Sequence, residues 1–175
     1  MEIGAVAPDF ALPSAAGSAV RLSRLRGRVV VLEWTSPVCP FTTRKYADGS
    51  AQRLQRDAVR AGMRWLLVDT AAPGKPGWLS PAAAMARLAK LRAPASAWLR
   101  DETGDVGRLY GARTTPSFYV VGADGRLRYQ GAADEDAFVD PAKSLLYVRE
   151  ALDDVLARRP VRRPETRPYG CAVEY

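Results

Sequence analysis

The chain has 175 residues, a length that suits one domain with a short appended tail. Its 47% hydrophobic and 26% charged residues are ordinary for a globular protein, and no apolar run reaches the roughly 18 residues that a membrane helix needs. Histidine is absent and there are two cysteines, Cys39 and Cys171. This composition excludes Ser-His-Asp and Cys-His catalysis and argues against a conventional zinc site.

The formal net charge is +7, and arginine supplies 22 of the 26 basic residues. The arginines are scattered, apart from a basic stretch at 158–167, whereas a nucleic-acid surface would gather basic and aromatic residues on one face. We therefore expect neither nucleic acid nor a membrane as a partner. Residues 1–10 show no secretory leader, which favours the cytoplasm, with a trimmed exported or periplasmic form as the alternative.

The first half of the chain predicts a hairpin, two strands and a helix. Phe10–Leu12 and Val20–Leu22 flank a turn of small residues and predict a short hairpin. The β-branched run Arg28–Trp34 predicts a buried central strand, and Met63–Asp69 predicts a second one. Between them, a helix is expected from Pro40 to about Gly62, because proline suits the first helical turn and glycine the end.

The second half predicts further alternation of helices and strands. A helix is expected to begin at Ser80-Pro81 and to end near Leu91. The remaining expected elements are a strand at Ala97–Arg100, a short helix at Asp101–Tyr110, strands Ser117–Gly122 and Leu127–Gln130 joined at Asp124-Gly125, and a helix at Asp140–Ala157. This order predicts an α/β fold with a central mixed sheet and helices on both faces. The closing hairpin and helix favour the thioredoxin-like version, over residues 1–157, with an irregular tail at 158–175.

Cys39 follows the first strong strand and directly precedes a helix. A helix N-terminus presents free N–H groups and a partial positive charge, both of which favour the thiolate. Arg44 and Lys45, one turn further on, would add to this effect. We therefore expect a reactive thiol, with a buried inert cysteine as the alternative.

Pro116 lies just before an apolar strand, in the segment Thr114–Phe118. In thioredoxin-like folds a proline at this place is cis, faces the active cysteine, and is preceded by backbone that binds an extended substrate. We therefore expect a cis bond at Thr115-Pro116. The alternative is an ordinary proline at the start of a strand.

Several short segments together resemble one family. They are Ala7-Pro8-Asp9-Phe10, Gly27–Trp34, Cys39-Pro40-Phe41, Asp101-Glu102, Tyr110-Gly111-Ala112, Thr115-Pro116, Asp124-Gly125 and the ending Pro168–Tyr175 with its Tyr-Gly-Cys motif. The chain resembles the redoxin branch of the thioredoxin superfamily, in particular bacterial peroxiredoxin-like relatives of alkyl hydroperoxide reductase and thiol-specific antioxidant proteins. The resemblance implies a thiol-dependent oxidoreductase without a cofactor, acting on a hydroperoxide or a protein disulfide. It also implies a thioredoxin-type or low-molecular-weight thiol reductant, and a monomer or homodimer.

The chain departs from the family patterns at several positions. Ser36 replaces the first cysteine of a Cys-x-x-Cys motif, and Leu32 stands where peroxiredoxins have proline. Arg113 is the candidate substitute for the peroxiredoxin arginine. Lys45 and Ser117 stand where the group usually has histidine. The departures leave the peroxidase set incomplete.

The resemblance assigns roles to the site residues. Cys39 is expected to be the redox-active thiolate, Cys171 the resolving thiol, and Ser36 a hydrogen-bond donor to the sulfur or the substrate oxygen. The expected substrate groove consists of Thr115, Pro116, Trp34, Phe41 and Arg113. Cys171 has two other interpretations: a dithiol partner in exchange with other proteins, or half of a structural disulfide that holds the tail. A non-catalytic module that binds an extended peptide beside Pro116 is the alternative function.

Other polar residues give weaker indications. Glu33, on the strand that leads to Cys39, is either a buried proton relay or a carboxylate with ordinary partners. Tyr46 is expected to line the mouth of the pocket together with Arg44 and Lys45. The acidic stretch 134–136 is expected to be a solvated loop, with calcium binding as a remote alternative.

Overall fold

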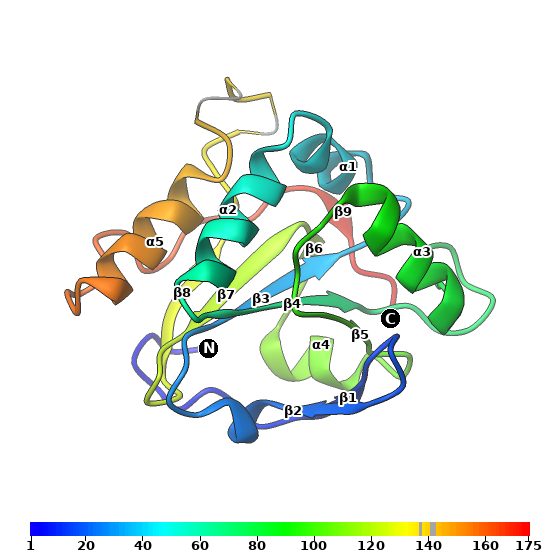
Figure 1. The fold of residues 1–175 in the computed structure, drawn as a ribbon, viewed down its shortest axis with the longest axis horizontal. Coiled ribbons are helices and arrows are strands. Elements are labelled where there is room, and N and C mark those ends of the chain that lie inside the picture. Colours follow the sequence, from blue (N-terminus) through cyan, green and yellow to red (C-terminus); the bar gives the residue numbers. More distant parts are fainter. Residues whose placement is uncertain (137, 141–142) are drawn as a thin grey trace.

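A five-stranded mixed sheet forms the middle of the computed structural model, which describes residues 1–136, 138–140 and 143–175 (Figure 1). Its strand order is β5-β4-β3-β7-β8. The strands are β3 (Val30–Thr35), β4 (Arg64–Asp69), β5 (Ala97–Arg100), β7 (Ser117–Val121) and β8 (Leu127–Gly131). The first three run parallel, β7 is antiparallel to β3, and β8 is antiparallel to β7.

Both faces of this sheet are covered, which confirms the predicted thioredoxin-like α/β architecture (Figure 1). One face carries α1 (Pro40–Ala47), α2 (Ser50–Arg60), α3 (Pro81–Leu91) and α5 (Leu146–Leu156). The other carries α4 (Asp105–Tyr110), the hairpin of β1 (Ala11–Pro13) and β2 (Ala19–Arg21), and the 3-10 helix η1 (Leu22–Leu25). All residues of β3 are buried because apolar side chains meet it from both sides.

The helix expected from Pro40 to Gly62 is in fact two helices, so this prediction was wrong. Gly49 separates them with φ of +78°, a left-handed conformation that glycine adopts without steric cost. The Asp48 carboxylate accepts the Ser50 N–H at 2.8 Å and so satisfies the start of α2. The chain therefore turns between α1 and α2, although the residues on either side are helical.

The last helix begins at Leu146, six residues after the expected start at Asp140. Residues 141–142 of the expected helix lie outside the described part of the chain. Leu145 has φ of +58°, and its N–H donates to the Asp134 carboxylate at 2.8 Å. A distant side chain therefore fixes the start of α5.

The tail is irregular over most of its length but contains one short strand, β9 (Cys171–Ala172). It first runs beside β8, where Gln130 exchanges backbone hydrogen bonds with Pro164 and Thr166 at 3.0 and 3.1 Å. It then pairs antiparallel with β6 (Thr114–Thr115), the residues that precede Pro116. The tail thus lies against the body of the fold at two separate edges (Figure 1).

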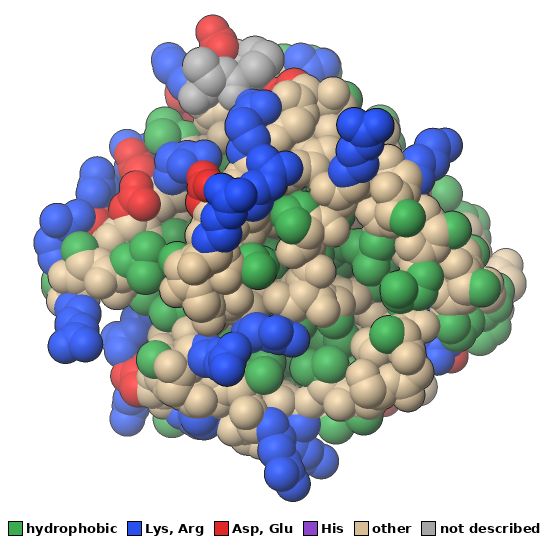
Figure 2. Space-filling model, viewed as in Figure 1, with side chains coloured by type: hydrophobic (Ala, Val, Ile, Leu, Met, Phe, Trp, Pro, Cys, Tyr) green, Lys and Arg blue, Asp and Glu red, His purple; other side chains and the backbone are tan. Residues whose placement is uncertain are grey.

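No helix in the described ranges is both long and apolar enough to cross a membrane. On the face shown in Figure 2, lysine and arginine side chains stand in separate groups with uncharged surface between them. The scatter of basic residues along the sequence is therefore also seen on this face of the folded chain.

Candidate active site

Cys39 lies at the N-cap of α1, where the strand-to-helix pattern predicted it. The residue is only 1% exposed, and its Sγ lies 3.1 Å from the carbonyl oxygen of Thr115, to which the thiol donates. The Thr115-Pro116 bond is cis, as expected. The fold therefore places the cysteine directly against the backbone that precedes the cis-proline.

Cys171 reaches the same place from the end of the chain. In the β6–β9 pair, Cys171 lies opposite Thr115, whose carbonyl oxygen faces Cys39. Both cysteines are free thiols and line one cavity of about 70 Å³. Its other lining residues are Thr35, Ser36, Val38, Thr70, Pro76, Thr115, Ala172, Val173 and Glu174.

The two thiols have opposite pKa shifts. Burial acts to raise the pKa of Cys39, but the Cys171 thiol and the Thr42 backbone N–H donate to its sulfur and leave that pKa below the ordinary value. Burial, together with the hydrogen bond to Cys39 and its charge, raises the pKa of Cys171 to about 11. The pair is therefore polarised: Cys39 is the more acidic of the two thiols, and Cys171 is the less acidic one.

Of Ser36, Arg113 and Pro116, only Ser36 is among the residues that line the cavity with the two cysteines. The Ser36 carbonyl accepts the Cys39 N–H at 3.2 Å, and Ser36 lines the cavity. Among the described residues, its hydroxyl makes no hydrogen bond to either cysteine. Arg113 is exposed and contributes its carbonyl, which accepts the Val173 N–H at 3.0 Å. Pro116 is buried beside Thr115.

Of the two aromatic residues expected in the groove, neither is among the residues that line the cavity, but the Phe41 backbone N–H donates to the Cys171 sulfur. Trp34 is fully buried on the sheet face that carries α4, where it packs on Tyr110 and Tyr119 and donates to Thr70 Oγ1 at 3.1 Å. Phe41 is half-buried and meets the ring of Tyr169 edge-on, with centroids 6.2 Å apart. Trp34 therefore belongs to the core, and Phe41 contacts the tail.

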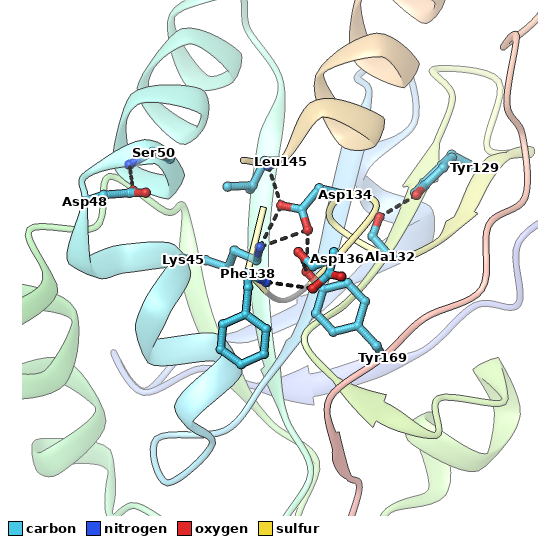
Figure 3. A network of polar contacts seen from close by, with 10 residues as sticks. All are labelled: Lys45, Asp48, Ser50, Tyr129, Ala132, Asp134, Asp136, Phe138, Leu145 and Tyr169. Carbon is cyan, nitrogen blue, oxygen red and sulfur yellow. Dashed lines mark hydrogen bonds and ion pairs between the residues drawn. The ribbon is translucent and has the colours of Figure 1, made fainter. Parts of the chain in front are cut away.

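The acidic stretch 134–136 is not simply a solvated loop, which corrects the expectation for Asp134. This carboxylate is 1% exposed and forms a buried ion pair with Lys45 Nζ at 2.7 Å (Figure 3). The Tyr169 hydroxyl donates to the same carboxylate and to the Asp136 carbonyl oxygen. The network joins α1, the segment after β8, and the tail two residues before Cys171.

Lys45 and Arg44 therefore do not act on the thiol as expected. Lys45 is 3% exposed and paired with Asp134, and the Arg44 guanidinium lies 5.1 Å above the Phe138 ring. Tyr46 also lies in the core, not at a pocket mouth, and its hydroxyl donates to Glu33 at 3.0 Å. The hydrogen bonds that lower the pKa of Cys39 come instead from the Cys171 thiol and from the backbone.

Glu33 is buried and has several hydrogen-bond partners, as its alternative interpretation stated. Trp65 Nε1 donates to it at 2.7 Å, and Gln55 Nε2 at 3.3 Å. Burial raises the pKa of Glu33 to about 7 despite these donors. Its described partners lie in the core beneath α1 and α2, and none of them is a cysteine.

Sequence reasoning missed Thr70 and Pro76 in the cavity wall and Tyr175 at the end of the tail. The Tyr175 ring lies beside α4 beneath the Arg108 guanidinium, 4.7 Å from ring centroid to Cζ, and its hydroxyl donates to the Ala112 carbonyl oxygen. A Cβ on Gly104 would lie 2.7 Å from this ring, so the glycine provides the space. The terminal aromatic of the tail motif was the only sequence signal for this contact.

Comparison with known proteins supports the assignment of this chain to the thioredoxin-like redox proteins. Residues 3–130 match the AhpC/TSA family. An uncharacterized conserved protein from Geobacillus kaustophilus is 27% identical with a TM-score of 0.88, over 99% of this chain and 92% of that one. A hypothetical protein from Sinorhizobium meliloti is 22% identical with a TM-score of 0.86, over 100% and 95%.

A third solved structure comes from Chlorobium tepidum, with a provisional assignment as the thiol:disulfide interchange protein DsbE. It is 26% identical with a TM-score of 0.62, over 90% of this chain and 97% of that one. Comparison with the curated proteins finds no match. The family match covers well over half of the chain, including Cys39 and the cis-proline. The chain belongs to the AhpC/TSA family of thioredoxin-like redox proteins.

Proposed function

We propose that the chain is a two-cysteine thiol peroxidase in which Cys39 attacks a hydroperoxide and Cys171 resolves the product. The observation that carries this proposal is the polarised pair in one cavity, with a lowered pKa at Cys39 and a protonated Cys171 against it. Nucleophilic attack needs the thiolate, and resolution needs a second thiol nearby.

The proposed reaction has two steps on the enzyme. The Cys39 thiolate attacks the distal oxygen of the hydroperoxide, the O–O bond breaks, and the leaving alkoxide takes a proton, so that sulfenic acid and an alcohol form. The Cys171 thiol then attacks the sulfenic sulfur, which releases water and forms the Cys39–Cys171 disulfide. A dithiol reductant of the thioredoxin type, or a low-molecular-weight thiol, supplies two electrons and returns both thiols.

The size of the cavity favours a small oxidant over a protein disulfide. A volume of about 70 Å³ accommodates a molecule the size of hydrogen peroxide beside Cys39, and the residue itself is 1% exposed. In this scheme the hydroxyl of Ser36, on the cavity wall, turns toward the peroxide oxygen. Thr115 on β6 pairs with Cys171 on β9, and its carbonyl oxygen faces Cys39.

The test compares two oxidants on the reduced wild-type chain. Hydrogen peroxide is expected to oxidise the thiols at least tenfold faster than glutathione disulfide at equal concentration. Cys39→Ser is expected to abolish peroxide turnover, whether a thioredoxin-type dithiol or a low-molecular-weight thiol serves as the reductant. Equal rates with both oxidants would favour thiol–disulfide exchange over peroxidase activity, and full peroxidase activity of Cys39→Ser would contradict the proposal.

A non-catalytic module with a structural Cys39–Cys171 disulfide is the second candidate. The burial of Cys39 favours it, because buried cysteines are commonly inert. The lowered pKa of Cys39 favours the redox protein instead. A disulfide that resists reduction by millimolar glutathione would support the structural alternative.

A further inference from the structure

The cavity that holds the two thiols contains little charge. Apart from the cysteines, its lining residues carry hydroxyl groups or are apolar, with the single exception of Glu174. Among the described residues that line it there is therefore one carboxylate and no lysine or arginine. A chain with a formal net charge of +7 thus presents a negative side chain at the place where Cys39 would meet an oxidant.

The tail holds Glu174 at this cavity from both sides. The N–H of the preceding residue, Val173, donates to the Arg113 carbonyl oxygen at 3.0 Å. The hydroxyl of the following residue, Tyr175, donates to the Ala112 carbonyl oxygen. Glu174 itself is exposed. A residue that lines the cavity and is also exposed to solvent lies at the cavity mouth.

No ion pair within the described ranges includes Glu174. Arg87 reaches the cysteine loop, but its guanidinium donates to a backbone carbonyl oxygen there at 3.4 Å. The Arg108 guanidinium lies over the ring of the last residue. Lys75 and Arg113 are exposed, and neither of them lines the cavity. The charge at the mouth is therefore set by Glu174.

A fixed negative charge at the mouth of a cavity repels anions and has little effect on neutral molecules. Because Glu174 is exposed, this repulsion weakens as salt is added. The effect acts on the approach of a molecule to Cys39 and does not depend on which reaction follows.

We propose that Glu174 is a specificity-determining residue that favours uncharged molecules over anions at Cys39. The oxidants of this chain are then uncharged hydroperoxides, and peroxy anions or hydroperoxides that bear a carboxylate are poor substrates. This choice of oxidant rests on the proposed peroxidase function, whereas the sorting by charge does not. Glu174 takes no part in the bond changes at the sulfur.

The experiment compares alkylation of Cys39 by iodoacetamide, which is neutral, and by iodoacetate, an anion of nearly the same size. Both reagents react with the same thiolate, so the ratio of their rates does not depend on the pKa of Cys39. Mass spectrometry of the peptide that contains Cys39 gives each rate, and free 2-mercaptoethanol gives the intrinsic ratio of the reagents. In low salt, Glu174→Gln is expected to lower the iodoacetamide-to-iodoacetate ratio at least threefold from the wild-type value.

The matched control is Glu2→Gln, which removes the same charge from an exposed glutamate that does not line the cavity. The segment after Glu2 is bonded to the β7–β8 hairpin, where the Gly4 N–H donates to the Leu127 carbonyl oxygen at 2.8 Å. This variant is expected to keep the wild-type ratio. The unaltered chain provides a second measurement, because about 0.5 M salt should lower the wild-type ratio toward that of Glu174→Gln and leave the ratio of the variant unchanged.

The proposal is overturned if wild type and Glu174→Gln give the same ratio in low salt. It is also overturned if Glu2→Gln lowers the ratio as much as Glu174→Gln, because the position of the charge would then not matter. Failure of the proposed function looks different. A chain that sorts the two alkylating agents but does not reduce hydrogen peroxide would support the role of Glu174 and contradict the peroxidase.

Discussion

The pKa of Cys39 is lowered without any help from imidazole, since the chain contains no histidine. The nearby cations do not replace it, because Lys45 is paired with Asp134 and Arg44 stacks on Phe138. The Cys171 thiol and a backbone N–H at the start of α1 instead favour the charged form of Cys39 and lower its pKa. Cys171 thus lowers the pKa of Cys39, in addition to the resolving role proposed for it.

This role predicts a difference between two replacements of Cys171. Cys171→Ser keeps a donor to the sulfur, whereas Cys171→Ala removes it. A donor favours the charged form, so the pKa of Cys39 should be lower in the serine variant than in the alanine variant. The rate of Cys39 alkylation against pH measures both values, and identical profiles would show that Cys171 does not tune the thiol.

Glu33 predicts a pH dependence of stability. Its pKa is about 7 in the fold and close to the model-compound value of 4.5 when unfolded, so the folded state binds the proton more tightly. Stability therefore falls as the pH rises from about 4.5 through 7, by a few kcal/mol in order of magnitude. Asp69, whose pKa burial raises to about 7, contributes in the same direction.

The measurement is the urea midpoint at a series of pH values for wild type and Glu33→Gln. Glutamine retains hydrogen-bonding capacity toward Tyr46 and Trp65 but does not ionise. The wild type should lose stability between pH 5 and pH 8 more steeply than the variant. Parallel curves would mean that Glu33 ionises in the fold as easily as in the unfolded chain.

Among the elements, α1 and the tail are joined through the buried Lys45–Asp134 pair. Removal of one partner leaves a buried charge uncompensated, at a cost of about 3–5 kcal/mol. Lys45→Met and Asp134→Leu should each show this loss in urea unfolding, and the double variant should lose less than either single change.

The matched control for this cycle is the exposed pair of Arg21 and Asp9, at 2.9 Å with side chains 53% and 40% exposed. Arg21→Ala should change the free energy of unfolding by no more than about 1 kcal/mol. If Lys45→Met costs no more than Arg21→Ala, the buried pair does not hold these elements together.

Elements with strong local patterns could be predicted from the sequence. The β-branched run of β3 and the Cys-Pro step before α1 specify their structure locally, and so does the Asp-Gly turn between β7 and β8. The break at Gly49 could not be predicted, because an isolated glycine is tolerated within a helical pattern. The burial of Asp134 depends on Lys45, 89 residues earlier, and no local pattern shows such a pairing.

The strand β9 was missed for a related reason. Two residues in a proline-rich tail have no apolar periodicity, and their strand conformation depends wholly on pairing with β6. The resemblance marked Cys171 as a site residue, but its position opposite Thr115 follows from long-range contacts. Trp34 was expected in the groove because it is close to the cysteine loop in sequence. This closeness does not determine which face of the sheet the side chain occupies, and Trp34 lies on the face that carries α4.

At the scale of the whole molecule, the course of the tail brings Cys171 to Cys39. It runs along β8, places Tyr169 on the Asp134 network, pairs with β6, and ends with Tyr175 beside α4 (Figure 1). Contacts of the tail before and after Cys171 therefore hold this residue next to Cys39, which lies far earlier in the chain. This arrangement makes an intramolecular disulfide the expected end product of oxidation.

The most direct test is to trap sulfenic acid on Cys39 after one equivalent of hydrogen peroxide and to map disulfides by mass spectrometry. Wild type should form the Cys39–Cys171 disulfide with little trapped sulfenic acid. Cys171→Ser should accumulate sulfenic acid on Cys39, because the resolving thiol is missing. Absence of sulfenic acid in Cys171→Ser, with Cys39 still reduced, would contradict the account.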